Sequence, residues 1–82
     1  MSRATTIDDA IVKSLERYFR DLDGQRACGM YDMVIRAVER PLLEVVMREA
    51  DGNQLRASEM LGINRNTLRK KLLQHGLLED AG

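Results

Sequence analysis

The chain has 82 residues, with 32% charged and 44% apolar side chains and a formal net charge of zero. This length allows one domain, residues 1–82, and the composition is typical of a soluble globular protein. The apolar runs are too short to cross a membrane, and the lone cysteine, Cys28, excludes an internal disulfide framework and fits a reducing cytoplasm.

The charged residues are segregated along the chain. Residues 1–52 carry eight basic and ten acidic side chains, whereas residues 53–78 carry five basic side chains and one acidic side chain. Residues 79–82 add two acidic side chains. Binding to nucleic-acid phosphates requires a localised cationic segment, so this distribution favours a polyanionic partner even though the net charge is zero.

The first predicted helix covers residues 7–22. Apolar residues recur in it at helical spacing: Ile7, Ile11, Leu15, Phe19 and Leu22. Thr6 is the expected N-cap, with Asp9 as its capping-box partner. Gly24 provides the C-terminal stop.

The second predicted helix covers residues 30–50 and is apolar on nearly every side. Its apolar residues are Met30, Met33, Val34, Ile35, Ala37, Val38, Leu42, Leu43, Val45, Val46, Met47 and Ala50. A helix that is apolar all round is buried all round. One chain of this size cannot surround such a helix but two copies can, so the pattern predicts a homodimer.

Pro41 lies inside the second helix and allows two interpretations. It lacks an N–H and clashes with the carbonyl of Ala37, so one helix with a bend is expected. The alternative is two helices that meet at Arg40-Pro41, with the proline in the first turn of the second. The apolar pattern continues in phase through the proline, which favours one helix.

Two short helices are predicted in residues 53–78. Asn53 caps the first, residues 54–61, and Gly62 ends it. Asn64 caps the second, residues 65–75, which Gly76 ends. The predicted fold class is therefore all-α, with four helices and no strands.

The two short helices have the features of a helix-turn-helix. Ala57 is small where the helices must approach, and Gly62 permits a tight turn. Ile63, Leu68 and Leu72 can fill the wedge between the helices, with Lys70 roughly opposite. Arg65, Asn66 and Thr67 form the open N-terminal turn of the second helix, where side chains reach base edges in a major groove.

Several segments of the chain resemble the Fis family, the bacterial factors for inversion stimulation. The likeness is carried by GNQLRA at 52–57, GINRNTLRKKL at 62–72, LERYF at 15–19, LDGQ at 22–25 and PLLEVVM at 41–47. It implies a cytoplasmic, nucleoid-associated homodimer in which the helices of residues 7–50 intertwine. It also implies a transcriptional regulator that bends double-stranded DNA at degenerate AT-rich sites, with RNA polymerase as a further candidate partner.

The resemblance assigns roles to individual positions. Asn64 and Arg65 match the residues that contact bases, and the matches to phosphate-contacting positions are Asn53, Arg56, Thr67, Arg69, Lys70 and Lys71. Leu55 departs from the family, because well-studied members have a phosphate-binding threonine there. Only about six residues precede the first predicted helix, in place of the N-terminal arm that activates a DNA invertase, so recombinase stimulation is not expected.

Three alternatives remain beside this interpretation. Sigma-54 enhancer-binding activators end in a similar helix-turn-helix, so residues 53–78 alone also fit an excised activator domain. A purely structural module would share the dimer without DNA affinity. An enzyme is disfavoured, because the chain has only one histidine, His75, and one cysteine, Cys28, and no glycine-rich phosphate loop. No cofactor, metal site or catalytic residue is expected.

Overall fold

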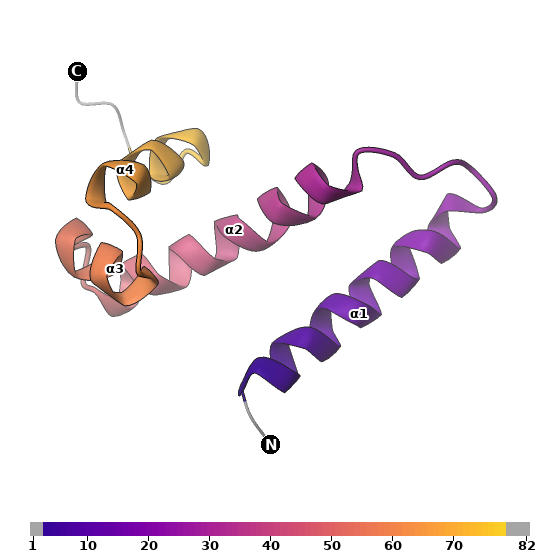
Figure 1. Ribbon diagram of the computed structural model, residues 1–82, viewed down its shortest axis with the longest axis horizontal. Coiled ribbons are helices and arrows are strands. Elements are labelled where there is room, and N and C mark those ends of the chain that lie inside the picture. Colours follow the sequence, from indigo (N-terminus) through magenta and orange to yellow (C-terminus); the bar gives the residue numbers. More distant parts are fainter. Residues whose placement is uncertain (1–2, 79–82) are drawn as a thin grey trace. The chain divides into compact units, whose positions relative to one another are not determined.

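The computed structural model describes the backbone of residues 3–78 and the side chains of residues 6–78. In this range the chain forms four helices and no strand, as predicted (Figure 1). They are α1 (Arg3–Leu22), α2 (Met30–Glu49), α3 (Gln54–Leu61) and α4 (Arg65–Gln74). The chain divides into two compact units, Met1–Met30 and Tyr31–Gly82, here called the N-terminal and the C-terminal unit.

Helix α1 begins at Arg3 rather than at the predicted Ile7. Thr6 therefore lies inside the helix, and the predicted N-cap and its capping box with Asp9 are wrong. Residues 3–6 contain neither glycine nor proline, and extending a helix by a residue costs much less than starting one. A capping preference worth about 1 kcal/mol does not stop such a helix.

The C-terminal end of α1 is as predicted, and its apolar residues stay largely accessible. The helix ends at Leu22, where Asp23 and Gly24 adopt left-handed backbone angles, with φ of 50° and 83°. Phe19 and Val12 are both 53% exposed. In the part of the N-terminal unit whose side chains are described, no apolar side chain is fully buried.

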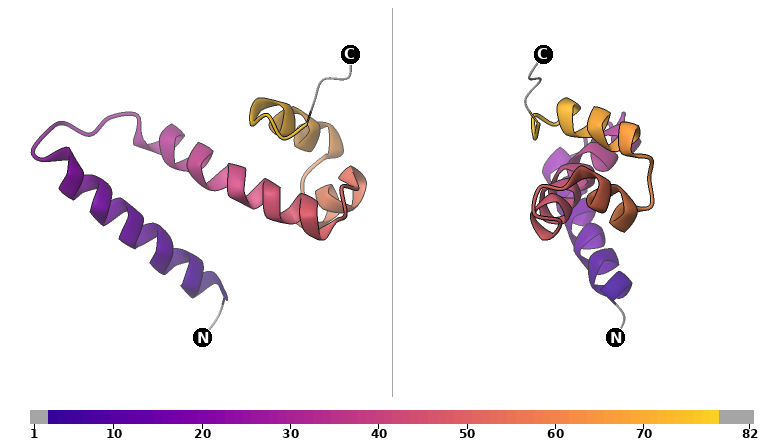
Figure 2. Two further views of the ribbon diagram at one scale, coloured as in Figure 1. Left: turned by 180° about the vertical axis from the view of Figure 1, so that it is seen from behind. Right: turned by 90° about the vertical axis from the view of Figure 1, so that its left-hand side faces the viewer.

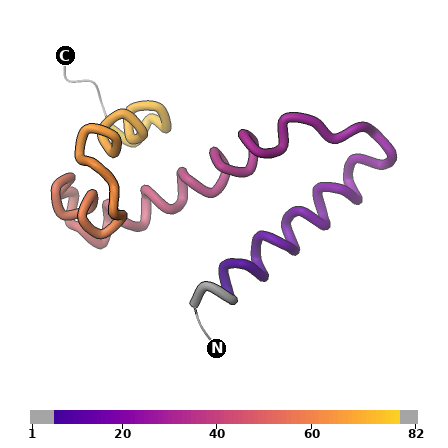
Figure 3. The backbone as a smooth tube through the Cα atoms, in the orientation of Figure 1, coloured from indigo at the N-terminus to yellow at the C-terminus, as the bar shows by residue number. Residues whose placement is uncertain are grey.

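Helix α2 runs without interruption through Pro41, which confirms one helix rather than two (Figure 3). A bend at the proline stays a prediction. The helix ends at Glu49, one residue before the predicted Ala50. Asp51 and Gly52 then turn the chain with φ of 54° and 78°, which takes Ala50 out of the helix and into the turn.

Two apolar stripes run along α2. The inner stripe consists of Leu43, Val46 and Met47, continued by Ala50 just after the helix. The outer stripe consists of Ile35, Val38, Leu42 and Val45. Leu43 and Ala50 are each 1% exposed, whereas three members of the outer stripe, Ile35, Leu42 and Val45, are between 43% and 47% exposed. One chain therefore covers one stripe and leaves the other accessible.

The core of the C-terminal unit joins the inner stripe to α3 and α4. Its fully buried members are Leu43, Ala50, Ala57, Leu68 and Leu72, and Ile63 packs against them. Figure 2 shows α3 and α4 joined by a short turn at the end of α2. Among the described helices, only α3 and α4 bring their backbones close together over several residues.

Candidate nucleic-acid interface

Helix α3 has the bounds and caps that the sequence predicts. The Oδ1 of Asn53 accepts a hydrogen bond from the backbone N–H of Arg56 at 3.0 Å. At the other end Gly62 adopts φ of 74°, and its N–H donates to the carbonyl of Ser58 at 2.8 Å. A side chain at Gly62 would strain this left-handed conformation, so the glycine is what permits the tight turn into α4.

Helix α4 begins as predicted and ends one residue earlier. The Oδ1 of Asn64 accepts a hydrogen bond from the N–H of Asn66 at 2.7 Å, which caps the helix. The helix ends at Gln74, and the predicted last residue, His75, is its C-cap with ψ of 1°. Because the next residue, Gly76, has φ of 70°, the chain leaves the helix at this histidine.

Helix α4 has an apolar face and a cationic face. Leu68 and Leu72 are fully buried, as predicted. Arg65, Arg69 and Lys70 are exposed, so three of the predicted DNA contacts lie on accessible parts of the helix. The packing of the leucines therefore determines which side of α4 meets solvent, and that side carries the positive charge.

The first turn of α4 brings the two predicted base-contacting residues together. Asn64 and Arg65 are adjacent and exposed, and Thr67 is exposed in the same turn. Because the Oδ1 of Asn64 is engaged in capping, its free group is the amide NH₂, which is a hydrogen-bond donor. The Oδ1 of Asn53 is likewise engaged at the start of α3, which leaves its NH₂ as a hydrogen-bond donor.

Helix α3 has both charged and apolar accessible side chains. Arg56 is exposed in its first turn, where a phosphate contact is predicted. Leu55, beside it, is 53% exposed, and Met60 is 52% exposed. A leucine side chain has no hydrogen-bond donor, so the Leu55 side chain cannot donate to a phosphate.

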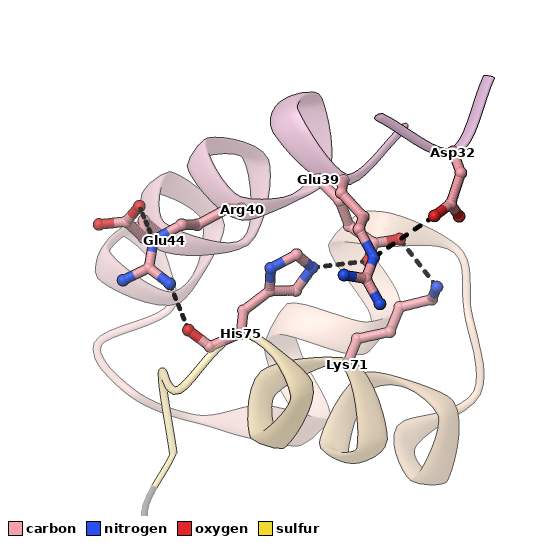
Figure 4. Close-up of polar contacts among 7 residues, drawn as sticks. Asp32, Glu39, Arg40, Glu44, Lys71 and His75 are labelled. Atoms are coloured by element: carbon pink, nitrogen blue, oxygen red, sulfur yellow. Dashed lines mark hydrogen bonds and ion pairs between the residues drawn. The ribbon is translucent and has the colours of Figure 1, made fainter. Parts of the chain in front are cut away.

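Lys71, a predicted phosphate contact, is paired with a carboxylate of the protein itself. Its Nζ lies 2.8 Å from the Oε2 of Glu39 on α2 (Figure 4). The other carboxylate oxygen, Oε1, lies 2.8 Å from the Nε2 of His75. The hydrogen bond from Lys71, and then that from His75, hold the pKa of Glu39 below its usual range despite partial burial.

Glu39, Lys71 and His75 form a cluster, called the clamp below, that was not predicted from the sequence. A partial signal was present, because Lys71 and His75 are four residues apart and so lie on one face of a helix. Their partner lies 32 residues before Lys71, and no local pattern connects it to α4. Only the packing of α2 against the end of α4 brings the three side chains together.

The described part of the chain offers little for other classes of site. Within it, no three side chains among His, Cys, Asp and Glu gather closely enough to hold a metal ion. Cys28 is exposed in the connector between α1 and α2. None of the described helices combines the length and the apolar character that a membrane span needs.

The chain is similar to known proteins over most of its length. The family model described as "Bacterial regulatory protein, Fis family" matches residues 34–75. Fis-like DNA-binding proteins from Neisseria meningitidis serogroups A and B are 61% identical over 72 residues, which cover 88% of this chain and 91% of each relative. One from Ralstonia nicotianae is 60% identical over 78 residues, or 95% of this chain and 100% of the relative.

A fourth relative is longer than the matched region. A Fis-like DNA-binding protein from Pseudomonas aeruginosa is 53% identical over 73 residues, which cover 89% of this chain and 70% of the relative. With this degree of likeness over most of its length, the chain belongs to the Fis family of bacterial regulatory proteins, which bind DNA through a helix-turn-helix and are not enzymes.

Proposed function

We propose that the protein binds double-stranded DNA as a homodimer, bends it and regulates transcription as a nucleoid-associated protein of the cytoplasm. The observation that carries this proposal is the orientation of α4. Its buried leucines leave an open, polar first turn and an exposed cationic side. A helix with these properties can enter a major groove with its N-terminal residues toward the base edges.

Base reading is assigned to the start of α4. Arg65 is exposed and long enough to present two donors to O6 and N7 of a guanine. Asn64 presents its free NH₂ to an acceptor on a neighbouring base, because its oxygen caps the helix. These two residues account for sequence preference in the proposal.

Phosphate binding is assigned to the side chains around this turn. The exposed set is Asn53, Arg56, Thr67, Arg69 and Lys70. Contacts of this kind position a protein on the duplex and make its affinity dependent on salt. Lys71 was predicted as a sixth phosphate contact, but its ammonium lies on Glu39, so it is not counted among the phosphate-binding side chains of this proposal.

The homodimer is supported by the outer stripe of α2. Its exposed members are Ile35, Leu42 and Val45, spaced so that they lie along one side of the helix. A run of apolar side chains this accessible on a small protein marks an interaction site. A second copy of the chain is the proposed partner, as the family resemblance implies.

Bending follows from the dimer. In the family, two recognition helices lie closer together than one turn of DNA, so the duplex must curve to meet both. A protein that curves its site selects sequences partly by their deformability, which suits degenerate AT-rich targets. A contact with RNA polymerase is the remaining part of the proposal.

A matrix of two variants and two duplexes tests the DNA contacts. Arg65→Ala should weaken binding and flatten the preference for a guanine at one base pair, since a bidentate contact contributes roughly 1–3 kcal/mol of discrimination. Lys70→Ala should weaken all sequences about equally and reduce the salt slope by about one per chain. Gel-shift titrations over a salt series measure both effects.

The two variants also show how the proposal could fail. If Arg65→Ala keeps the guanine preference while Lys70→Ala removes it, α4 enters the groove in a different orientation. If both variants bind like the unmodified protein, α4 is not the DNA-binding element. The duplex without the guanine serves as the control for uniform weakening.

A further inference from the structure

The clamp is the polar contact that ties the end of α4 to α2. Glu39 on α2 receives Lys71 and His75 on its two carboxylate oxygens, each at 2.8 Å. The next residue of α2, Arg40, donates from Nη1 to the backbone carbonyl of His75. Figure 4 shows Lys71 of α4 and its C-cap, His75, pointing toward the same carboxylate. Adjacent residues of α2 thus hold both the side chain and the backbone of the α4 C-cap.

The clamp differs from the other ion pairs of α2 in distance and in shielding. The pair of Arg36 with Asp32 spans 3.8 Å between side chains that are 77% and 84% exposed. In the clamp the side chains of Glu39 and His75 are 18% and 12% exposed, and that of Lys71 is 35% exposed. Exposed pairs contribute little to stability, whereas short, shielded, charge-assisted hydrogen bonds contribute substantially.

The clamp holds one end of α4, and the proposed DNA-binding turn lies at the other end. Lys71 and His75 lie at the C-terminal end of the helix, and Arg65 lies at its start. At 1.5 Å per residue the two ends are roughly 15 Å apart. Among the described helices, only α3 keeps its backbone close to that of α4 over several residues, so the side-chain contacts of the clamp are a main link between α2 and α4. A change of tilt at the clamped end would therefore displace the arginine.

We propose that Glu39 is a positioning residue for DNA recognition: by holding Lys71 and His75 it fixes the orientation of α4 on α2. The proposal rests on the assignment of α4 as the helix that reads DNA. It gives Lys71 a role inside the protein, where its charge is compensated by the carboxylate. Lys70, the exposed neighbour, has its charge directed to solvent and so to DNA.

The opposite arrangement predicts an effect of the opposite sign. If Lys71 bound phosphate directly, Glu39 would compete with DNA for the same ammonium group. Removing the carboxylate charge would then free the lysine and strengthen DNA binding. If Glu39 positions α4, removing its charge weakens DNA binding although a negative charge has been taken away. The direction of the change thus separates the two arrangements.

The experiment compares Glu39→Gln, Lys71→Met and the double variant in DNA affinity over a salt series. All are measured at a temperature at which circular dichroism shows each variant fully folded, so that lost stability alone does not alter affinity. We expect each single variant to bind DNA about tenfold more weakly, because it loses a charge-assisted hydrogen bond of the clamp. The salt slope should be unchanged. The double variant should bind no more weakly than the weaker single variant, because the two residues act as one unit.

Matched controls come from neighbouring residues. Glu49→Gln makes the same charge change at an exposed position of α2, and it measures the general electrostatic effect of losing one acid. Lys70→Met makes the lysine change at an exposed position and should reduce the salt slope by about one per chain. Glu39→Gln must bind more weakly than Glu49→Gln for the proposal to stand.

Two results would overturn the proposal. The first is a Glu39→Gln variant that binds as tightly as Glu49→Gln or more tightly. The second is a Lys71→Met variant whose salt slope falls as that of Lys70→Met does. Arg65→Ala, measured in parallel, separates either result from a failure of the proposed function. If it keeps its base preference as well, the assignment of α4 to DNA reading is what fails.

Discussion

Helix α1 and the C-terminal pair α3 and α4 differ in how far their described apolar side chains are buried. In α3 and α4 the side chains of Ala57, Leu68 and Leu72 are buried within a single chain. In α1, Phe19 and Val12 remain 53% exposed. The C-terminal helices complete their core with residues close in sequence, mainly each other and the end of α2. Helix α1 has an amphipathic pattern with no comparable core in its own unit.

Helix α2 contains both behaviours in one element. Its inner stripe closes the core under α3 and α4, and its outer stripe stays accessible. The difference indicates that the core under α3 and α4 is complete in one chain, while the outer stripe leaves apolar surface that the proposed dimer would bury. Substitutions on the two stripes should therefore have different consequences.

The largest effect is expected from a charge on the outer stripe. Leu42→Glu would place a carboxylate in the proposed dimer interface, where an unpaired buried charge costs roughly 3–5 kcal/mol per chain. Sedimentation at micromolar concentration should show twice the chain mass for the unmodified protein and a loss of that species for the variant. Leu55→Glu, a similarly exposed leucine on α3, is the control and should leave the mass unchanged. A dimer that tolerates Leu42→Glu would remove the outer stripe from the interface.

The second effect is a loss of packing in the C-terminal core. Leu68→Ala should lower the free energy of unfolding by roughly 2–5 kcal/mol, because the side chain is fully buried and leaves a cavity. Met60→Ala, at a half-exposed position of α3, should change it by less than about 0.5 kcal/mol. Denaturant titration at one fixed protein concentration measures both variants. Equal losses for the two would show that α3 and α4 do not form a closed core.

The smallest effect concerns acid. Because Lys71 and His75 hold the pKa of Glu39 below its usual range, the clamp stabilises the fold above the pKa of an ordinary glutamate. This stabilisation, about 1–2 kcal/mol for shielded charge-assisted bonds, should be lost as the pH falls through the lowered pKa of the folded state.

Glu39→Gln provides the comparison for this pH dependence. The difference in unfolding free energy between the unmodified protein and the variant should shrink as the pH falls below about 5, where the Glu39 carboxylate becomes protonated. Glu49→Gln, at an exposed position, should follow the unmodified protein. A difference that persists in acid would mean that the carboxylate charge contributes nothing to the clamp.

Much of the architecture could be predicted from local patterns. Asn53 and Asn64 are caps as expected, Gly62 makes the turn, and Leu68 and Leu72 face the core, because caps, turns and helical faces depend on residues a few positions apart. The predicted start of α1 at Ile7 is wrong. Thr6 resembles a cap, but no glycine or proline in residues 3–6 stops the helix before it.

The tertiary structure decided what no local pattern contains. It shows which stripe of α2 is buried and which is accessible. The sequence does not distinguish them, because the helix is apolar on nearly every side. It also pairs Glu39 with Lys71 and His75. The family resemblance assigns Lys71 to a phosphate. Whether a cation faces DNA or a carboxylate depends on which residues the packing of distant segments brings within a few ångströms, where electrostatic attraction between partly shielded groups is strong.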